Sequence, residues 1–373
     1  MKKTVLATAT ALGALAGAAH AQSSVTLYGL IDTAIGYTSN LGATNGKINH
    51  GIQALPGAMS APRWGLLGTE DIGGGTKVTF RLENGFNSQT GTLGQGGRIF
   101  GRSAYVAIGN SYWGTVTAGR QYMPFQEDVG TEVAAYYMTA YTFHPYDSDD
   151  LNGTFRPNNA IKYTTPTIGG FTAKGMYAFS NLAGQINTNR LWSASADYVN
   201  GPLHLDAGFF TVNQPGSTTV GAEASDNTYG ALPTIAAGGI AKHTVWGLGA
   251  GYTFGALLAD FLYTNAAFDA KAGGVLRFNN YEATMRYQLT PATVLTAAYL
   301  YTNQRSTVAA NGNTHYNQGE VGIDYFLSKS VDIYSNLIFQ KAAGAAHAWI
   351  LNTTSMSSND RQFVVAVGIR KKF

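Results

Sequence analysis

The sequence predicts an all-β fold, a transmembrane antiparallel β-barrel of 16 strands, and three observations support it. Charged residues make up only 12% of the 373 residues, about half the share in an ordinary soluble domain. After residue 21 no apolar run reaches the length of about 18 residues that a membrane-spanning helix needs. Apolar and polar residues alternate with a period of two along much of the chain, as they do in the strands of membrane barrels.

The first 21 residues have the three parts of a secretory signal peptide. Lys2 and Lys3 give a positive start, residues 5–18 form a short apolar run, and Ala19-His20-Ala21 supplies the small residues that a signal peptidase needs. The apolar run is too short to be a membrane helix. The sequence therefore predicts a cleaved signal at 1–21 and a single barrel domain at 22–373.

Two further features of the composition narrow the class of protein. The chain has no cysteine, so an exported fold cannot be held together by disulfide bonds. The formal net charge is +3, and it falls to +3 − 2 = +1 once Lys2 and Lys3 are removed. A charge this small gives no reason to expect a nucleic-acid partner.

The alternation is clearest in the second half of the chain. In 243–254, aromatic and apolar residues at even positions share one face, and mostly small residues, three of them glycines, share the other. In 281–289 and 331–341, mainly apolar residues at odd positions oppose polar residues, with Ile338 as the exception. A helical period would scatter these sets. Aromatic residues near the ends of the apolar faces are typical of the girdles that meet lipid headgroups.

Sixteen segments show this alternation, and the connections between them alternate in length. Tight connections contain turn residues, as in 71–75 and 328–330, whereas 39–60 and 123–157 are long. This is the arrangement of outer-membrane barrels, and an even strand count places both termini on the short-turn, periplasmic side. The predicted strands are about 24–38, 61–70, 76–87, 98–109, 114–122, 158–166, 171–180, 190–199, 203–213, 242–254, 256–265, 278–289, 293–303, 315–327, 331–341 and 362–373.

Six segments, taken together, point to a known family. They are Ser24 to Asp32, Arg63 to Gly75, Gly101 to Ile108, Gly114 to Tyr122, Asn159 to Tyr163 and Val367 to Phe373. They resemble the general trimeric porins of the Gram-negative outer membrane, of the β-proteobacterial type, over nearly the whole chain after residue 21. The resemblance implies a homotrimer embedded in outer-membrane lipid, with a water-filled channel for passive diffusion of small hydrophilic solutes and ions. It implies no enzyme activity and no cofactor.

The last residue, Phe373, ends an apolar stripe formed by Phe363, Val365, Val367 and Ile369. In the family, such an aromatic C-terminus resembles the signal that the outer-membrane assembly machinery reads. The alternative is an edge strand that happens to end in Phe. We therefore expect Phe373 to be the contact to the assembly machinery.

The resemblance also places a constriction inside the barrel, formed by the long loop after the fifth strand. Here that loop is 123–157, with the acidic residues Glu127, Asp128 and Glu132. Opposed charges across a narrow pore create a transverse field that favours polar permeants; alternatively, the basic groups only hydrogen-bond the loop or are solvated. The sign of the ion selectivity stays open, with anions favoured. The basic wall implied by the resemblance, and supported by alternation for the first four, is Arg63, Lys77, Arg81, Arg102 and Arg156.

One arginine falls on the apolar face of its predicted strand. Arg120 shares parity with Val116 and Ala118, and a charge facing lipid is costly. It therefore lies either at the interface with a protein partner or at the rim of the barrel. The resemblance implies that the trimer packs through the first several strands, with the loop 88–97 reaching over a neighbour.

The sequence shows no metal-ligand spacing, no phosphate-binding loop and no nucleophile elbow. His204 and His243 fall on the lumen face and are expected to be solvated wall residues. An outer-membrane phospholipase or protease would need Ser or Asp beside His at one rim, and no such set can be selected. Two rival hypotheses stay open: a substrate-specific channel, with aromatic residues of 136–146 as a slide, and an adhesin or structural barrel with a plugged lumen.

Overall fold

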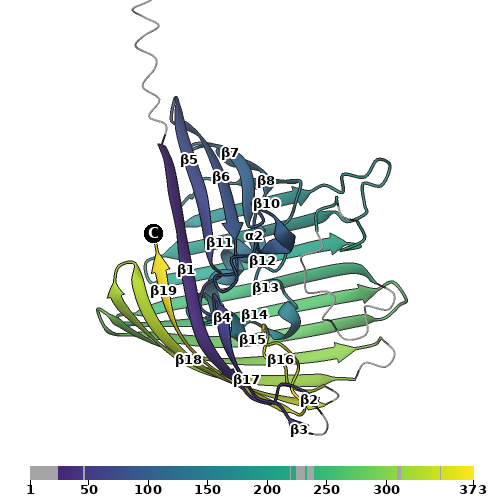
Figure 1. Ribbon diagram of the computed structural model, residues 1–373. Helices are drawn as coiled ribbons and strands as arrows, with labels where there is room; N and C mark the ends of the chain where they lie inside the picture. The colour runs from purple at the N-terminus through teal and green to yellow at the C-terminus, as the bar shows by residue number, and fades with distance from the viewer. Residues whose placement is uncertain are drawn as a thin grey trace, which may run out of the picture.

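The computed structural model describes residues 24–44, 47–218, 220–223, 232, 239–308, 312–344 and 346–373; the predicted signal 1–21 lies outside them. The described chain forms an antiparallel sheet closed into a barrel of 16 strands, as predicted (Figure 1). The strands are β1 (Ser24–Thr38), β5 (Arg63–Gly73), β6 (Thr76–Gly85), β7 (Ser103–Asn110), β8 (Gly114–Arg120), β9 (Ala160–Thr164), β10 (Phe171–Ala178), β11 (Leu191–Asn200), β12 (Leu203–Asn213), β13 (Ile240–Phe254), β14 (Leu257–Ala270), β15 (Val275–Thr290), β16 (Thr293–Ser306), β17 (Thr314–Ser328), β18 (Val331–Gly344) and β19 (Arg361–Lys372).

The first and last strands close the barrel. Strands β1 and β19 pair antiparallel, from Leu30 opposite Lys372 to Thr38 opposite Val364, and lie side by side in Figure 1. The backbone of Phe373 continues the pairing, because its N–H donates to the carbonyl of Gly29 at 3.0 Å and its carbonyl accepts from the N–H of Gly29 at 2.9 Å. A Cβ atom on Gly29 would lie 2.5 Å from the carbonyl oxygen of Arg63 and 2.6 Å from Cζ of Phe373, so a larger residue would clash with the backbone of β5 as well as with the ring.

The second barrel strand is interrupted, which the sequence did not predict. The six residues of β4 (Gly51–Pro56) pair with the second half of β1, and β5 pairs with its first half. Residues 57–62 leave the sheet between them and turn into the barrel, where Asp32 accepts the N–H groups of Met59 and Ser60 at 3.1 and 2.7 Å. The segment 39–60, predicted as a loop, also contains the small hairpin β2 (Ala43–Thr44) and β3 (Lys47–Ile48).

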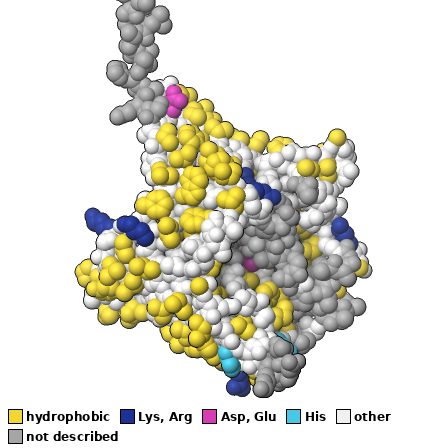
Figure 2. Space-filling view, viewed as in Figure 1, with side chains coloured by type: hydrophobic (Ala, Val, Ile, Leu, Met, Phe, Trp, Pro, Cys, Tyr) yellow, Lys and Arg dark blue, Asp and Glu magenta, His cyan; other side chains and the backbone are white. Residues whose placement is uncertain are grey.

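The predicted inside and outside faces are confirmed. Along β15 the outward Tyr281, Met285 and Tyr287 are 41–59% exposed, whereas the inward Glu282 and Thr284 are each 1% exposed. Figure 2 shows the outer surface over β1, β5 and β6 covered largely by hydrophobic side chains. The exceptional Ile338 points inward, where it packs in a buried cluster with Tyr141 and Ile350.

The short turns lie where the sequence placed them, including the one at Gly73, Gly74 and Gly75, whose φ angles of 91°, 59° and 74° favour glycine. The strand predicted at 98–109 is shorter, since β7 begins at Ser103. The residues before it contain the 3₁₀ helix η1 (Gln95–Gly97).

The long segment after the fifth barrel strand folds into the lumen, as predicted. We call residues 121–159 the inner loop; it contains α2 (Pro124–Asp128) and the 3₁₀ helices η2 (Val129–Glu132), η3 (Ala134–Tyr136), η4 (Ala140–Thr142) and η5 (Pro145–Asp147). None of the helices in the described ranges is long and apolar enough to cross a membrane.

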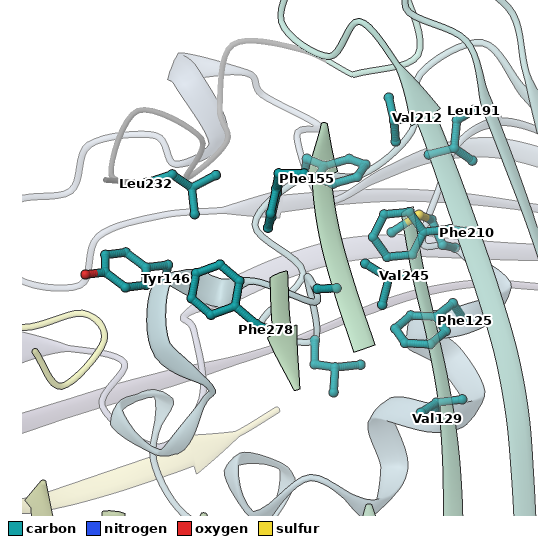
Figure 3. Close-up of a cluster of buried hydrophobic side chains, with 14 of the residues drawn as sticks. Phe125, Val129, Tyr146, Phe155, Leu191, Phe210, Val212, Leu232, Val245 and Phe278 are labelled. Carbon is teal, nitrogen blue, oxygen red and sulfur yellow. The ribbon is translucent and has the colours of Figure 1, made fainter. Parts of the chain in front are cut away.

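The inner loop packs against the inner face of β11 to β15 through apolar side chains. Phe125 packs edge-on against Phe210, with 5.4 Å between the ring centroids, and Figure 3 shows it beside Val245 as well. Glycine makes this approach possible: a Cβ on Gly208 or on Gly247 would lie 3.2 Å from the Phe125 ring. These two glycines are register partners on β12 and β13, so the wall is hollowed where the loop rests.

Candidate functional site

The inner loop, residues 57–62 and the facing wall enclose a cavity of about 920 Å³. The charged groups that line it are strongly unbalanced in sign. Among the described residues that line it, the acids are Glu127 and Asp324, and both have a basic partner: Lys162 lies 2.6 Å from Glu127, and Arg370 lies 3.7 Å from Asp324. The basic residues that line it are Arg63, Arg102, Arg156, Arg286, Arg370 and Lys372.

Three of the predicted basic residues come together around Tyr122. The guanidinium carbons of Arg102 and Arg156 lie 5.8 and 4.8 Å from the centre of the Tyr122 ring, and Nη2 of Arg156 donates to the Tyr122 hydroxyl at 3.0 Å. Burial raises the pKa of Tyr122, but the two guanidinium charges lower it more, and the net pKa is lowered. Arg63 lies close to the same group. The arrangement concentrates positive charge on one side of the cavity.

Arg102 is held in place by an acid that the sequence interpretation did not use. Its Nε lies 2.7 Å from Oε1 of Glu83, and each side chain is 7% exposed. Glu83 also accepts a hydrogen bond from the hydroxyl of Tyr28 at 2.8 Å. Part of the charge of Arg102 is therefore neutralised behind the cavity, whereas the described part of the chain gives Arg63 no carboxylate within salt-bridge distance.

Two other residues predicted for the basic wall, Lys77 and Arg81, do not line this cavity. Lys77 is exposed near the 73–76 turn and lines a separate cavity of about 590 Å³. Arg81 lies over the ring of Tyr28, 5.7 Å from its centre. Both have lumen-face parity, but parity alone does not say how far along the pore a side chain lies.

The acids predicted for the constriction divide between two directions. Glu127 lines the cavity, but Asp128 and Glu132 turn toward the wall behind the inner loop. Asp128 pairs with Lys174 and accepts from Oγ of Ser195 at 2.5 Å. Both acids pair with Lys174, but the side chain of Glu127 is 31% exposed and that of Asp128 only 5%, as the offset of about 100° between consecutive helix residues allows. The pattern of charges identified the loop, but Asp128 and Glu132 fasten it instead of facing the arginines.

A buried ion cluster fastens the middle of the inner loop. Nδ1 of His144 lies 2.7 Å from Asp149, and its Nε2 lies 3.2 Å from Glu282 of β15; all three side chains are at most 1% exposed. Burial lowers the pKa of His144, but the neighbouring carboxylates outweigh it and raise the pKa to about 10. Burial raises the pKa of Asp149, but the charge of His144 lowers it below its usual value. The raised pKa favours the protonated form of His144, and its ring lies between Asp149 of the loop and Glu282 of the wall.

Arg120 finds hydrogen-bond acceptors within its own chain, so its charge does not by itself require a protein partner. Its side chain is 7% exposed, and it donates to the carbonyls of Gly101 and Arg156 at 2.7 and 2.8 Å and to Oδ1 of Asn158 at 2.6 Å. The residue ends β8 directly after Gly119, whose φ of 130° departs from strand geometry. Its charge is therefore stabilised without a second subunit.

The loop 88–97 also contacts its own barrel, since Oγ of Ser88 donates to the carbonyl of Asp32 at 2.8 Å.

The two histidines predicted on the lumen face differ in exposure. His204 is partly exposed, as expected, but His243 is 1% exposed, stacks on Phe268 with 4.0 Å between ring centroids, and lies 3.0 Å from the carbonyl of Ser148. The expectation of a solvated His243 is wrong because the inner loop covers it.

The sequence interpretation missed three basic residues of the cavity, Arg286, Arg370 and Lys372, although alternation puts them on the lumen face. Arg286 lies over the ring of Tyr137 on the inner loop, 5.4 Å from its centre. Arg370 pairs with Asp332 at 3.0 Å and donates to Oγ of Ser60 at 2.7 Å. They come from strands far along the chain from the inner loop, so only the closed barrel reveals their proximity.

An apolar outer face, a closed ring of strands and a charged inner cavity define a transmembrane β-barrel channel. The chain belongs to the Gram-negative porin family, whose model matches residues 7–342. It is an outer-membrane porin, and its water-filled lumen allows passive diffusion of small hydrophilic solutes and ions.

Three similar proteins agree with this assignment. The chain is 30% identical to outer membrane porin protein 32 of Delftia acidovorans, over the full length of both. It is 35% identical to an outer membrane porin protein of Bordetella pertussis, over 62% of this chain and 65% of that protein. Its fold is similar to that of the anion-selective porin from Comamonas acidovorans, with a TM-score of 0.76 and 28% identity over 94% of this chain and all of that one.

Proposed function

We propose that this porin is selective for small anions. The observation that carries the proposal is the lining of the main cavity, where the described residues include six basic side chains and two acids. Both acids have basic partners, and of the six bases Arg102 and Arg370 pair with the wall acids Glu83 and Asp332, which leaves a positive surplus. A surplus of fixed positive charge in a narrow, low-dielectric opening raises the local concentration of anions and repels cations. The similar porin from Comamonas acidovorans is described as anion-selective, which supports the same sign here.

Planar-bilayer recording across a potassium chloride gradient tests the proposal. The wild-type reversal potential is expected to indicate preference for chloride, and the double variant Arg63→Gln, Arg156→Gln is expected to shift it toward potassium. Arg81→Gln is the matched control, because Arg81 is basic and on the lumen face but does not line the cavity. An unchanged reversal potential in the double variant would show that these arginines do not set the selectivity.

The inner loop also carries an observation in favour of a substrate-specific channel. Three of its aromatic side chains, Tyr136, Tyr137 and Phe143, line the same cavity beside Arg286. Such a surface can hold an aromatic acid by ring stacking and charge. Saturable block of the chloride current by benzoate would favour this second candidate over general diffusion.

We propose further that the chain forms a homotrimer through β5 to β9. Strand β9 has five residues, which extend about 17 Å and fall short of the apolar band of about 25 Å. The outward Val106, Ile108 and Ile161 on these short strands are 41–52% exposed. A second copy of the chain can cover the apolar outer face of these strands, which are shorter than the apolar band of the membrane.

Mass measurement of the detergent-extracted protein tests the trimer. Wild type is expected to be trimeric, and Val106→Arg, Ile161→Arg is expected to give folded monomers, because charges in the interface would be buried unpaired. A wild-type monomer would refute the proposal.

The remaining assignments concern export and assembly. Residues 1–21 are proposed as the cleaved signal, both termini as periplasmic, the outward face as the lipid contact, and the protein as a channel without enzyme activity. Phe373 is proposed as the contact to the assembly machinery; its side chain is 54% exposed on the outer face while its backbone closes the barrel.

A further inference from the structure

A group of carboxylates behind the inner loop contrasts with the basic cavity on the other side. Glu132 of η2, Asp206 of β12 and Asp260 of β14 are 2%, 4% and 7% exposed. Each has a carboxylate oxygen without a hydrogen-bond donor in the described part of the chain: Oε2 of Glu132, both oxygens of Asp206 and Oδ2 of Asp260. Burying unpaired carboxylates is costly, so the group requires a positive charge or protons.

One histidine lies among them. Nδ1 of His204 is 2.9 Å from Oε1 of Glu132, and its Nε2 is 3.2 Å from Oδ2 of Asp206. His204 and Asp206 are two residues apart on β12, so they share the inward face of that strand. Lys174 of β10 pairs with Asp128 and Glu127, whereas the imidazole of His204 contacts both Glu132 and Asp206.

The wall provides space for the carboxylate of Glu132 to enter. Gly249 of β13 is the register partner of Asp206, and a Cβ on Gly249 would lie 2.7 Å from Oε2 of Glu132. The inner loop therefore places the carboxylate of Glu132 in a depression of the wall that is lined by Asp206 and His204. One ligand atom each from Glu132, His204 and Asp206 lie within 4.8 Å of one another.

We propose that Glu132, His204 and Asp206 bind a divalent transition-metal cation of the zinc class, which links the inner loop to β12. One imidazole nitrogen and two carboxylate oxygens are a ligand set that suits zinc, whereas calcium and magnesium sites are built from oxygen atoms alone. Three protein ligands leave one position for water, and the 32% exposure of the His204 side chain gives the ion a path from the lumen. The cation neutralises the carboxylates of Glu132 and Asp206 and is coordinated by oxygens that otherwise lack a hydrogen-bond donor.

The alternative is that Glu132 and Asp206, which are close enough to hydrogen-bond, share a proton. Metal binding by the intact, untagged porin distinguishes the two. Protein extracted from membranes, stripped with a chelating resin and dialysed against zinc chloride is expected to retain about one zinc per chain, with no displacement by excess calcium chloride. Mass spectrometry of the bound metal gives the stoichiometry.

Two variants locate the site. His204→Gln and Asp206→Asn are each expected to weaken zinc binding by at least about tenfold. His315→Gln, which changes a histidine stacked on Tyr301 outside the cluster, is expected to bind like wild type. A difference in SDS-gel mobility between the unheated and the heated protein, equal to that of wild type, confirms that each variant is folded.

Three results would overturn the proposal: folded wild type that retains no zinc, zinc binding that survives His204→Gln, or retention of calcium in place of zinc. The outcome is independent of the proposed anion selectivity, because none of the three ligands lines the main cavity.

Discussion

Replacing His144 by Gln tests whether an ion cluster holds the inner loop against the wall. In the folded protein His144 has a pKa of about 10, against 6.5 for an ordinary histidine, because Asp149 and Glu282 outweigh the effect of burial. A raised pKa contributes stability that is complete below pH 6.5 and is lost as the pH rises through 10. Asp149 has a lowered pKa, so its contribution is present above its ordinary value of 3.8 and is lost in acid.

The two pKa values of His144 set the size of the effect. A difference between 10 and 6.5 at about 1.36 kcal/mol per pH unit corresponds to about 5 kcal/mol, the upper end of the roughly 3–5 kcal/mol expected for breaking a buried ion pair. His144→Gln is therefore expected to lower the free energy of unfolding by that amount at pH 6. The difference from wild type is expected to shrink by about 1.4 kcal/mol per pH unit between pH 6.5 and 10.

Urea unfolding in lipid vesicles, followed by tryptophan fluorescence at pH 6, 8 and 10, measures this difference. His50→Gln is the control, since His50 is exposed and has no ion pair in the described part of the chain, and it should match wild type at each pH. A wild-type advantage over His144→Gln that is the same at pH 6 and pH 10 would refute the charged bridge and leave only a packing effect.

Two further predictions concern the closure of the barrel. Gly29→Ala is expected to lower the free energy of unfolding by about 1–3 kcal/mol in the same urea assay, because its Cβ would clash with the carbonyl oxygen of Arg63 and with the Phe373 ring. Gly175→Ala, where a Cβ meets nothing within 4 Å, should be neutral, and equal effects of the two substitutions would remove the steric explanation. Deleting Phe373 is expected to reduce the folded porin in outer-membrane fractions, since both the closing backbone pair and the proposed assembly signal are lost; undiminished yield would count against Phe373 as the signal.

The strands could be predicted because alternation is a local property of the chain. The outward Trp246, Leu248 and Phe254 appear in the sequence as every second residue, and in the structure they are 43–61% exposed. The short strand β4 could not be found this way. It has six residues, ends in Pro56, and is recognised only by its pairing with β1, which depends on how the intervening chain folds.

The basic wall was predicted in part, because parity gives direction but not depth. The cavity is lined by the predicted Arg63, Arg102 and Arg156, but the predicted Lys77 lies near a turn and lines another cavity. Arg370 of the last strand lines the main cavity although it was not predicted. Strand tilt and stagger decide which residues of distant strands reach the same height, and these follow from the closed register and not from one strand.

The pattern of charges in the sequence could not predict which way the loop acids point. The glycines of the facing strands, however, indicate where the loop contacts the wall. Gly208 and Gly247 are partners on neighbouring strands, and Gly249 follows on the same face. A barrel face without side chains at adjacent positions loses packing unless something else fills the space. The inner loop fills it with Phe125 and Glu132. Inward glycines that align across strands therefore indicate where a loop contacts the wall. The charge of a loop acid at such a position must be compensated by a positive group or a proton on the wall.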